Sequence, residues 1–317
     1  MTLTTIASPT VLYGRPAYEG ANIRTWIGFK HFMYLVEQAV LQWLRDQGTS
    51  ARTLYLEHGL GVEIVDCSMQ LPAVLELDDE VRAQVSIDRG GRLAVQLSVN
   101  RGGAEVTVLR GKVTLALVRE RTAPAHRPAP DALAGFEVAD LAEASTVARA
   151  DRLRLPDRLR LADGESVESV FGNDPRTFVW SWRAPYFYCH FSDRVQHSGF
   201  VRALEEVVDR FLADRGISVG RLLAERSWIP VVSRARVQLV EAAHMEETIH
   251  TVFTVVDILR GVMFDARMSC YVQRGAELVP VATAQILHGY AIAAGDGAGG
   301  LAELDGEVSR ALTGGRP

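Results

Sequence analysis

Two stretches of this sequence repeat each other at a constant spacing of 168 residues. Segment Phe32–Asp46 (FMYLVEQAVLQWLRD) matches segment Phe200–Asp214 (FVRALEEVVDRFLAD), so that Glu205, for example, lies 168 positions after Glu37. The same spacing aligns further identical residues on either side without a gap: Val11, Arg15 and Tyr18 with Val179, Arg183 and Tyr186, Gly48 with Gly216, and Gln70-Leu71 with Gln238-Leu239. Because one spacing is held across loop, helix and strand, the chain is expected to fold as two copies of one unit that arose by an old duplication.

Each copy has the same predicted order of elements. A short strand (Thr10–Tyr13 or Thr177–Trp182) is followed by a loop and then by a helix of about 17 residues whose apolar residues recur at helical spacing. Both helices are apolar around much of their circumference, so each is expected to be wrapped by a sheet. Long strands follow, namely Gly61–Ala73, Glu80–Asp88, Arg92–Asn100 and Ala104–Glu120 in the first copy and Val231–Val240, Thr248–Leu259, Val262–Gln273 and Leu278–Ile292 in the second.

The predicted boundaries divide the chain into four parts. Residues 1–121 form the first copy and residues 171–296 form the second. The run Arg121–Pro130 (RTAPAHRPAP) is proline-rich and polar, which is typical of a linker. We therefore expect residues 122–170 to be a linker with a partial helix that connects the copies, and residues 297–317 to be a C-terminal tail.

A strand, a long helix and an antiparallel run of strands are the layout of the hotdog fold, in which a sheet wraps a central helix. Segment Phe191–Phe211 (FSDRVQHSGFVRALEEVVDRF) resembles the motif of the 4-hydroxybenzoyl-CoA thioesterase branch of this superfamily, roughly D-x-D-x-x-G-H-V-N-N-x-x-Y-L-x-x-x-E-E. Val195-Gln196-His197 falls on V-N-N, Phe200-Val201 on Y-L and Glu205-Glu206 on E-E, and Gly28–Ala39 is a weaker version of the motif. The resemblance implies an α+β chain of two tandem hotdog folds that form an intramolecular pseudo-dimer, since a lone hotdog leaves a sheet edge exposed.

This resemblance implies an enzyme that acts on acyl thioesters of coenzyme A or of an acyl carrier protein. Hydrolysis in a fatty-acid or polyketide type of secondary metabolic pathway is the leading expectation. Two alternatives stay open: a dehydratase or acyltransferase/decarboxylase that acts on a carrier-bound polyketide intermediate, and a non-catalytic acyl-binding module. No cofactor is expected, because CoA or phosphopantetheine would arrive as part of the substrate.

The sequence departs from the family motif at the catalytic carboxylate. That position, ten residues before the motif tyrosine, is His190 in the second copy and Asn22 in the first. The motif's G-H pair becomes Asp193-Arg194. Either the acid or base has moved in this chain, or the chemistry differs.

The second copy supplies the candidate catalytic residues. His190, Asp193, Gln196 and His197 lie within eight positions, where the loop meets the helix. Thioester chemistry needs a polarised carbonyl and a base or nucleophile, and a helix N-terminus with such side chains can provide both. We assign His190, Asp193, His197 and Glu205 as catalytic candidates, with Gln196 holding water or the carbonyl oxygen. Each of three candidates also has a structural alternative: Asp193 could cap the helix, His197 could be a hydrogen-bonded structural residue, and Glu205 could lie on a solvated face.

The first copy supplies candidate substrate-binding residues. Asn22, Arg24 and His31 lie near the start of its helix, together with Lys30, and would suit a phosphate group. Glu37 lies further along the helix, and His58 precedes the first long strand. An exposed surface with no ligand would carry the same residues equally well.

The composition and charge of the chain limit the classes of partner that it is expected to bind. A net charge of −5 and a pI of 5.9 argue against a nucleic-acid binder, which needs a basic surface. Three scattered cysteines fit a reducing cytoplasm and make a metal site unexpected. No apolar run suggests a membrane span, and the N-terminus lacks the pattern of a secretory signal. We expect a cytoplasmic protein that binds acyl-CoA or an acyl carrier protein and that can pair as a homodimer.

Overall fold

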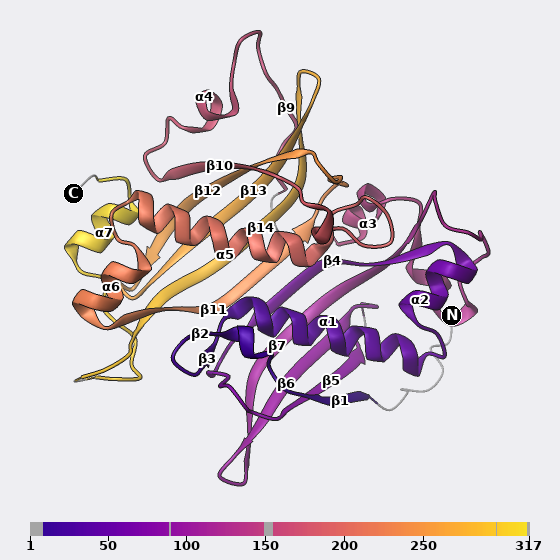
Figure 1. Cartoon of the computed structure of the whole chain (residues 1–317), viewed down its shortest axis with the longest axis horizontal. Helices are drawn as coiled ribbons and strands as arrows, with labels where there is room; N and C mark the ends of the chain where they lie inside the picture. Colours follow the sequence, from indigo (N-terminus) through magenta and orange to yellow (C-terminus); the bar gives the residue numbers. More distant parts are fainter. Residues whose placement is uncertain (1–8, 89, 149–154, 296, 316–317) are drawn as a thin grey trace. The chain divides into compact units, whose positions relative to one another are not determined.

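A computed structural model describes residues 9–88, 90–148, 155–295 and 297–315 of the chain. The chain divides into two compact units, unit 1 up to Glu137 and unit 2 from Val138 onward. Each unit contains an antiparallel sheet and one long helix (Figure 1). This arrangement is the strand, helix and sheet layout of the hotdog fold, so the predicted fold class is confirmed within each unit.

Unit 1 is built around helix α1 (Phe29–Asp46). Its main strands, in spatial order, are β1 (Thr10–Gly14), β5 (Val81–Ile87), β6 (Leu93–Arg101), β7 (Ala104–Arg119) and β4 (Leu60–Gln70). Every neighbouring pair in this order is antiparallel. The smaller elements are η1 (Tyr18–Gly20), β2 (Ala21–Ile23), β3 (Trp26–Ile27), α2 (Ala51–Thr53), the π-helical turn η2 (Leu54–His58) and η3 (Asp131–Phe136).

Unit 2 is built in the same way around helix α5 (His197–Asp214). Its main strands, in spatial order, are β10 (Thr177–Arg183), β12 (Thr248–Leu259), β13 (Met263–Arg274), β14 (Glu277–Ile292) and β11 (Trp228–Leu239). These pairs are antiparallel as well. The smaller elements are α3 (Leu141–Ala148), β9 (Leu159–Arg160), α4 (Val167–Phe171), η4 (Tyr186–Tyr188), α6 (Val219–Arg226) and α7 (Gly306–Leu312).

The predicted repeat is confirmed element by element. Helices α1 and α5 both have 18 residues and begin 168 positions apart, at Phe29 and His197. The spacing then rises to 173 positions, because β7 begins at Ala104 and β14 at Glu277. The extra residues lie in the β12–β13 hairpin, whose strands have 12 residues each against 7 and 9 in β5 and β6.

The two sheets share two irregularities of their strand pairing. A register shift after Ile64 in β4 has its counterpart after Val232 in β11, at the spacing of 168. A second shift after Leu97 in β6 has its counterpart after Cys270 in β13, at the spacing of 173. Bulges at the same places in both copies mean that both sheets bend at the same points.

Each long helix buries a wide apolar face. Helix α5 buries Phe200, Leu204, Val207, Phe211 and Leu212, among others, and α1 buries the corresponding residues of unit 1. Burying a side chain of this size contributes about 2 kcal/mol through the hydrophobic effect. Both helices end as predicted, because Gly48 and Gly216 follow them with positive φ angles of 85° and 71°, which favour glycine.

The linker prediction falls partly outside the described residues, which omit 149–154. Of the rest, Leu161 and Val167 pack with Val252, Tyr271 and Leu278 of the unit 2 sheet, and Phe171 stacks on the Tyr271 ring. This small cluster is built on the side chains of β12, β13 and β14, so the end of the expected linker takes part in the fold of unit 2.

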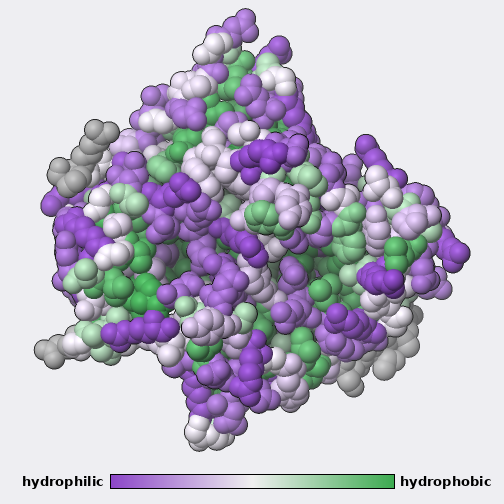
Figure 2. All heavy atoms as spheres, viewed as in Figure 1, coloured by the Kyte–Doolittle hydropathy of each residue, from purple (hydrophilic) through white to green (hydrophobic). Residues whose placement is uncertain are grey.

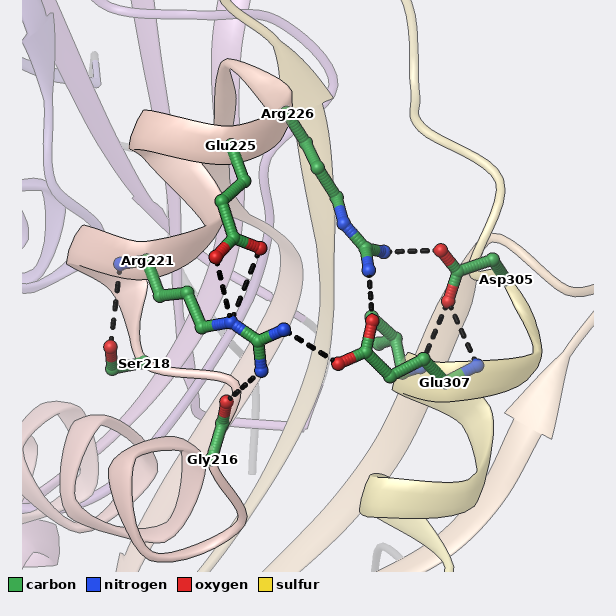
Figure 3. A network of polar contacts seen from close by, with 8 residues as sticks. Gly216, Ser218, Arg221, Glu225, Arg226, Asp305 and Glu307 are labelled. Atoms are coloured by element: carbon green, nitrogen blue, oxygen red, sulfur yellow. Dashed lines mark hydrogen bonds and ion pairs between the residues drawn. The ribbon is translucent and has the colours of Figure 1, made fainter. Parts of the chain in front are cut away.

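The C-terminal segment contains helix α7, which is fastened to α6 by a network of ion pairs that we call the C-terminal clasp (Figure 3). Arg226 binds both Asp305 and Glu307. Arg221 binds Glu307 at 2.8 Å and Glu225 at 3.0 Å. Beneath these polar contacts α7 buries its apolar side, made of Val308, Ala311 and Leu312.

The surface seen in Figure 2 mixes hydrophilic residues with small hydrophobic patches. That mixture is ordinary for a face in contact with water. Individual large apolar residues are nevertheless exposed, and two of them, Tyr186 and Phe187, belong to η4 directly before the candidate site in unit 2.

Candidate functional site at the start of helix α5

The candidate site is built from two segments of unit 2, the site loop (Cys189–Gln196) and the support turn (Glu241–Glu247). The site loop leads into helix α5, and the support turn connects β11 to β12. Backbone hydrogen bonds join them: Val195 N–H donates to Ala243 O at 2.8 Å, and Met245 N–H donates to Asp193 O at 2.6 Å. The support turn therefore fixes the place of the loop residues that carry the polar side chains.

Unit 1 contains the same two backbone hydrogen bonds between its loop and its turn, which we call the backbone frame. Ile27 N–H donates to Leu75 O at 2.9 Å, and Leu77 N–H donates to Thr25 O at 2.8 Å. Each of these residues lies 168 positions before its counterpart in unit 2. The duplication has therefore kept the frame in both copies, and the copies differ in the side chains that the frame presents.

Helix α5 begins at His197 without a side-chain cap. Its N-cap residue is Gln196, whose side chain makes no capping hydrogen bond, and Gln196 N–H donates to Tyr188 O at 2.9 Å. Asp193 lies further back in the loop, so the reading of Asp193 as the helix cap is wrong. The helix start carries partial positive charge, which suits the oxygen of a polarised carbonyl.

His190 and Gln196 lie together at this helix start. His190 Nδ1 is 3.4 Å from Gln196 Oε1, a long hydrogen bond. Burial, and to a smaller extent the nearby Arg194 charge, lower the pKa of His190 to about 4. The imidazole is consequently neutral at pH 7, with a basicity close to that of an ordinary carboxylate. The residue that replaces the family carboxylate in this sequence thus has a carboxylate-like pKa.

His197 is buried, with 5% of its surface exposed. Its Nε2 lies 3.1 Å from Val237 O, a carbonyl that can only accept, so Nε2 carries the hydrogen. Burial lowers the pKa of His197 to about 4, although the bond to Val237 works in the opposite direction. These contacts tie the first residue of α5 to strand β11, which favours the structural reading of His197.

Asp193 is exposed and faces a histidine that the sequence reading missed. Its Oδ1 lies 3.3 Å from His244 Nδ1 in the support turn. The counterpart in unit 1 is Thr25, whose Oγ1 donates to Glu76 Oε2 at 3.4 Å. The repeat alignment, which places His244 opposite Glu76, is the sequence signal that could have pointed to His244.

Glu205 lies half-buried on α5, two turns after the helix start. Its neighbour Glu206 pairs with Arg210 at 2.7 Å on the exposed side of the helix. The structure brings His190, Gln196 and His197 to the helix start and places Glu205 further along the same helix.

In unit 1, Asn22 and Gly28 occupy the places of His190 and Gln196. The Asn22 side chain lies so close over Gly28 that a Cβ at Gly28 would meet Asn22 Nδ2 at 2.1 Å. His31 is buried, and its ring packs on Gly20 and edge-on against Tyr34. The start of α1 is thus filled by side chains that pack on glycines.

The remaining candidates of unit 1 are spread over the unit. Arg24 is exposed in the turn between β2 and β3, with a positive φ of 60°. Lys30 and Glu37 are half-buried on α1. His58 ends η2, and its Nδ1 lies 2.6 Å from Pro128 O, so it holds the segment that follows β7.

Two further findings concern ligands and membranes. Among the described residues, no group of three or more His, Cys, Asp or Glu side chains is placed to hold a metal ion. Within the same residues, no helix is both long and apolar enough to cross a membrane.

No protein-family model matches this sequence, and no curated protein sequence matches it. Solved structures are similar to it in fold. A Lactobacillus plantarum protein provisionally assigned as an oleoyl thioesterase has 12% identity and a TM-score of 0.56, and the match covers 91% of this chain and 98% of that one. The 12:0-ACP thioesterase from Umbellularia californica has 12% identity and a TM-score of 0.55, with 89% and 94% covered.

An acyl-ACP thioesterase from Bacteroides thetaiotaomicron is similar as well, with 11% identity, a TM-score of 0.52, and 88% of this chain and 97% of that one covered. At such low identity these likenesses show the fold. They show it over nearly the whole length of each chain, so the fold shared with these structures extends through both units.

Proposed function

We propose that this chain hydrolyses acyl thioesters carried on coenzyme A or on an acyl carrier protein and releases the free acid. The observation that carries the proposal is the uncapped start of helix α5 with His190 and Gln196 beside it. Fold likeness over nearly the full length of the two acyl-ACP thioesterases supports it.

The helix start would polarise the substrate. The thioester carbonyl oxygen gains negative charge when water attacks the carbonyl carbon. Backbone N–H groups at an uncapped helix start stabilise such an oxygen, and removing one comparable donor from an enzyme costs about 10²-fold to 10³-fold in rate. Gln196 stands at the entrance to this helix and is in reach of the same region.

His190 would act as the general base. With Gln196 Oε1 as acceptor, Nδ1 carries the hydrogen and Nε2 is the basic nitrogen. A water molecule gives its proton to Nε2 as its oxygen attacks the carbonyl carbon. When the tetrahedral intermediate collapses, the C–S bond breaks and the thiolate leaving group takes that proton, which returns His190 to its neutral form.

The remaining candidate residues keep the roles that the sequence suggested for them, as part of the proposal. Asp193 and Glu205 remain catalytic candidates, Asp193 through its contact with His244. Asn22, Arg24, His31, Glu37 and His58 of unit 1 remain substrate-binding candidates. The contacts of His31 with Gly20 and of His58 with Pro128 favour structural roles for these two.

A dehydratase is the second candidate function. That chemistry pairs a histidine with an acid, and in the sequence His190 and His197 are the histidines nearest to Asp193. The structure has an acid–histidine pair that uses a different histidine, since His244 lies 3.3 Å from Asp193. The pair is exposed, with 63% of the Asp193 side chain accessible, whereas acid–base residues work best in sites shielded from water, so hydrolysis is the better supported reading.

Three finer points complete the proposal. They are a fatty-acid or polyketide type of secondary metabolic pathway, a place in the cytoplasm, and assembly as a homodimer. The pathway and the homodimer rest on the family resemblance, and the cytoplasmic location rests on the three scattered cysteines. We further propose that no resident cofactor is needed, because the thiol carrier belongs to the substrate.

The experiment is an incubation of the purified chain with a panel of acyl-CoAs and acyl carrier proteins, followed by intact mass. The panel includes saturated, malonyl, methylmalonyl and β-hydroxyacyl species. Hydrolysis predicts the free thiol and the free acid. A carrier-bound product lighter by the mass of one water would replace the proposal with the dehydratase, and loss of CO₂ would replace it with the decarboxylase. Tight binding without turnover of any substrate would leave the acyl-binding module.

A further inference from the structure

The last residue of strand β13, Arg274, holds the support turn of unit 2 in place. Arg274 donates from Nε to Glu247 Oε1 at 3.0 Å and from Nη2 to Glu247 Oε2 at 3.1 Å. Its Nη2 also donates to the backbone oxygen of Ala242 at 2.6 Å. The planar guanidinium group thus grips both ends of the support turn at once, a geometry that suits arginine and that lysine cannot reproduce.

A short chain of hydrogen bonds connects Arg274 to the candidate site. Glu247 Oε2 accepts from the backbone N–H of His244 at 2.7 Å, which fixes the middle of the support turn. On either side of His244, Ala243 and Met245 hold the site loop through the two backbone bonds to Val195 and Asp193. Arg274 therefore helps to fix the position of the site loop, which carries His190 and Gln196, although its hydrogen bonds are to the support turn.

Unit 1 contains the same arrangement. Arg101 Nη2 donates to Asp79 Oδ2 at 2.6 Å and to Val74 O at 2.9 Å. Asp79 Oδ2 accepts from the backbone N–H of Glu76 at 2.9 Å. Arg101 lies 173 positions before Arg274, and Asp79 lies 168 positions before Glu247, so these residues correspond at the spacing of the strands on which they lie.

We call the contacts of Arg274 with Glu247 and Ala242, and those of Arg101 with Asp79 and Val74, the arginine clamp of each unit. The clamp of unit 2 contains more ion pairs than that of unit 1. Arg274 Nη1 also donates to Glu241 Oε1 at 3.0 Å, and Glu241 in turn pairs with Arg158. The corresponding position in unit 1 is Ala73, which offers no charged side chain. Burial alone would raise the pKa of Glu247, but hydrogen bonds from Arg274 and from His244 N–H lower it overall, so this carboxylate is ionised at neutral pH.

We infer that Arg274 is a positioning residue for the site at the start of α5, and that Arg101 holds an equivalent loop in unit 1 that does not carry the catalytic step. The inference rests on the proposed hydrolysis and sharpens it, because it assigns the working site to unit 2. The duplication kept the clamp in both units, while the polar pair His190 and Gln196 stands only in the second.

Two matched variants test this inference, Arg274→Lys and Arg101→Lys. Each keeps a positive charge and removes the planar fork. For Arg274→Lys we expect kcat to fall by about tenfold or more and KM to change by less than about threefold, since misplacing a reacting group by an ångström can cost about 10²-fold. For Arg101→Lys we expect kcat within about twofold of the parent chain, whereas KM is free to change because the unit 1 loop carries the substrate-binding candidates Asn22 and Arg24.

Amide hydrogen exchange gives a readout that does not depend on turnover. Arg274→Lys should speed exchange at Val195 and Met245, and Arg101→Lys should speed exchange at Ile27 and Leu77. Faster exchange of the site loop with an unchanged kcat would overturn the inference, as would an equal loss of kcat in both variants. Unchanged exchange at Val195 and Met245 in Arg274→Lys would also overturn the inference, because it would show that Arg274 does not hold the site loop.

Failure of the proposed function looks different. A parent chain that hydrolyses no thioester in the panel contradicts the hydrolysis, while the exchange data still decide whether Arg274 holds the loop. If Arg274→Lys does not fold, Glu247→Gln replaces it, because glutamine keeps an oxygen that can accept from His244 N–H and loses the charge that Arg274 binds. We expect a smaller loss of kcat there, about threefold, and no loss would contradict the inference.

Discussion

At the scale of single residues, the two copies hold the same positions and place different chemistry in them. Asn22 corresponds to His190, Gly28 to Gln196 and Thr25 to Asp193, each 168 positions apart. The contacts are kept even where the residues change, as in Thr25 with Glu76 and Asp193 with His244. Acid–base groups are therefore concentrated at the helix start of unit 2.

One exchange of residues shows how packing was preserved. In unit 1 the His31 ring of the helix packs on Gly20 of the loop, whereas in unit 2 the Tyr188 ring of the loop packs on Gly199 of the helix. The aromatic ring and the glycine have changed places. Either arrangement fills the space between loop and helix, so only one ring fits there, and a second large side chain would have to displace the first.

His197 leads to a prediction about acid stability. Its pKa is about 4 in the folded chain and 6.5 when unfolded, so between these values only the unfolded state binds the proton. The free energy of unfolding therefore falls as the pH drops from 6.5 toward 4, by about 1.4 kcal/mol per pH unit for this residue. His197→Gln, whose amide can still donate to Val237 O, should lose this contribution and show a shallower decline.

Urea unfolding at pH 7.5 and at pH 5 measures the effect. Above pH 6.5 the two chains should differ only by the change in packing. A pH dependence in His197→Gln as steep as that of the parent chain would show that His197 is not held neutral by burial.

The sequence predicted where the candidate residues lie more completely than the contacts that they make. The resemblance placed His190, Gln196 and His197 at the helix start, where the structure has them. The reading of Asp193 as a helix cap was wrong, because the helix begins at His197 and Asp193 instead joins the support turn. That contact depends on pairing between segments about 50 residues apart, which local sequence patterns do not encode.

At the scale of elements, hydrophobic periodicity predicted the two long helices and the long strands well. It missed α6 and α7, which are short helices with a single apolar side each. The change of spacing from 168 to 173 also went unseen, because the β12–β13 hairpin extends into solvent, where no core constrains the residues. Val256, at the bulge in this extension, is 45% exposed.

The C-terminal clasp leads to a prediction about α7. Glu307 accepts from both Arg221 and Arg226, so Glu307→Ala leaves two arginines without their shared partner. We expect a loss of about 1 kcal/mol in stability, within the usual range for a partly exposed ion-pair network. We also expect faster hydrogen exchange within Gly306–Leu312, because the clasp holds this helix to α6.

Glu303→Ala is the matched control, since Glu303 is an exposed glutamate on the same segment. The difference between the two variants should shrink at high salt, because salt screens exposed ion pairs. Equal exchange rates in both variants would mean that the buried Val308 and Leu312 hold α7 without help from the clasp.

At the scale of the whole molecule, the chain is a duplicated fold in which one copy carries the candidate catalytic side chains. Both copies retain the frame, the bulges and the arginine clamp, which are what the fold and the helix start require. The polar pair at the helix start, which the proposed hydrolysis uses, belongs to unit 2. The proposed hydrolysis thus depends on His190.

The most direct measurement is kcat for thioester hydrolysis in His190→Asn, which gives unit 2 the residue that unit 1 has at this position. His250→Asn is the control, because it makes the same substitution at a half-buried histidine of the same unit that contacts Ser181. We predict that His190→Asn lowers kcat by about 10²-fold or more, as expected for loss of a general base, while His250→Asn stays close to the parent chain. Undiminished hydrolysis in a folded His190→Asn variant would contradict the account and move the catalytic base elsewhere in the chain.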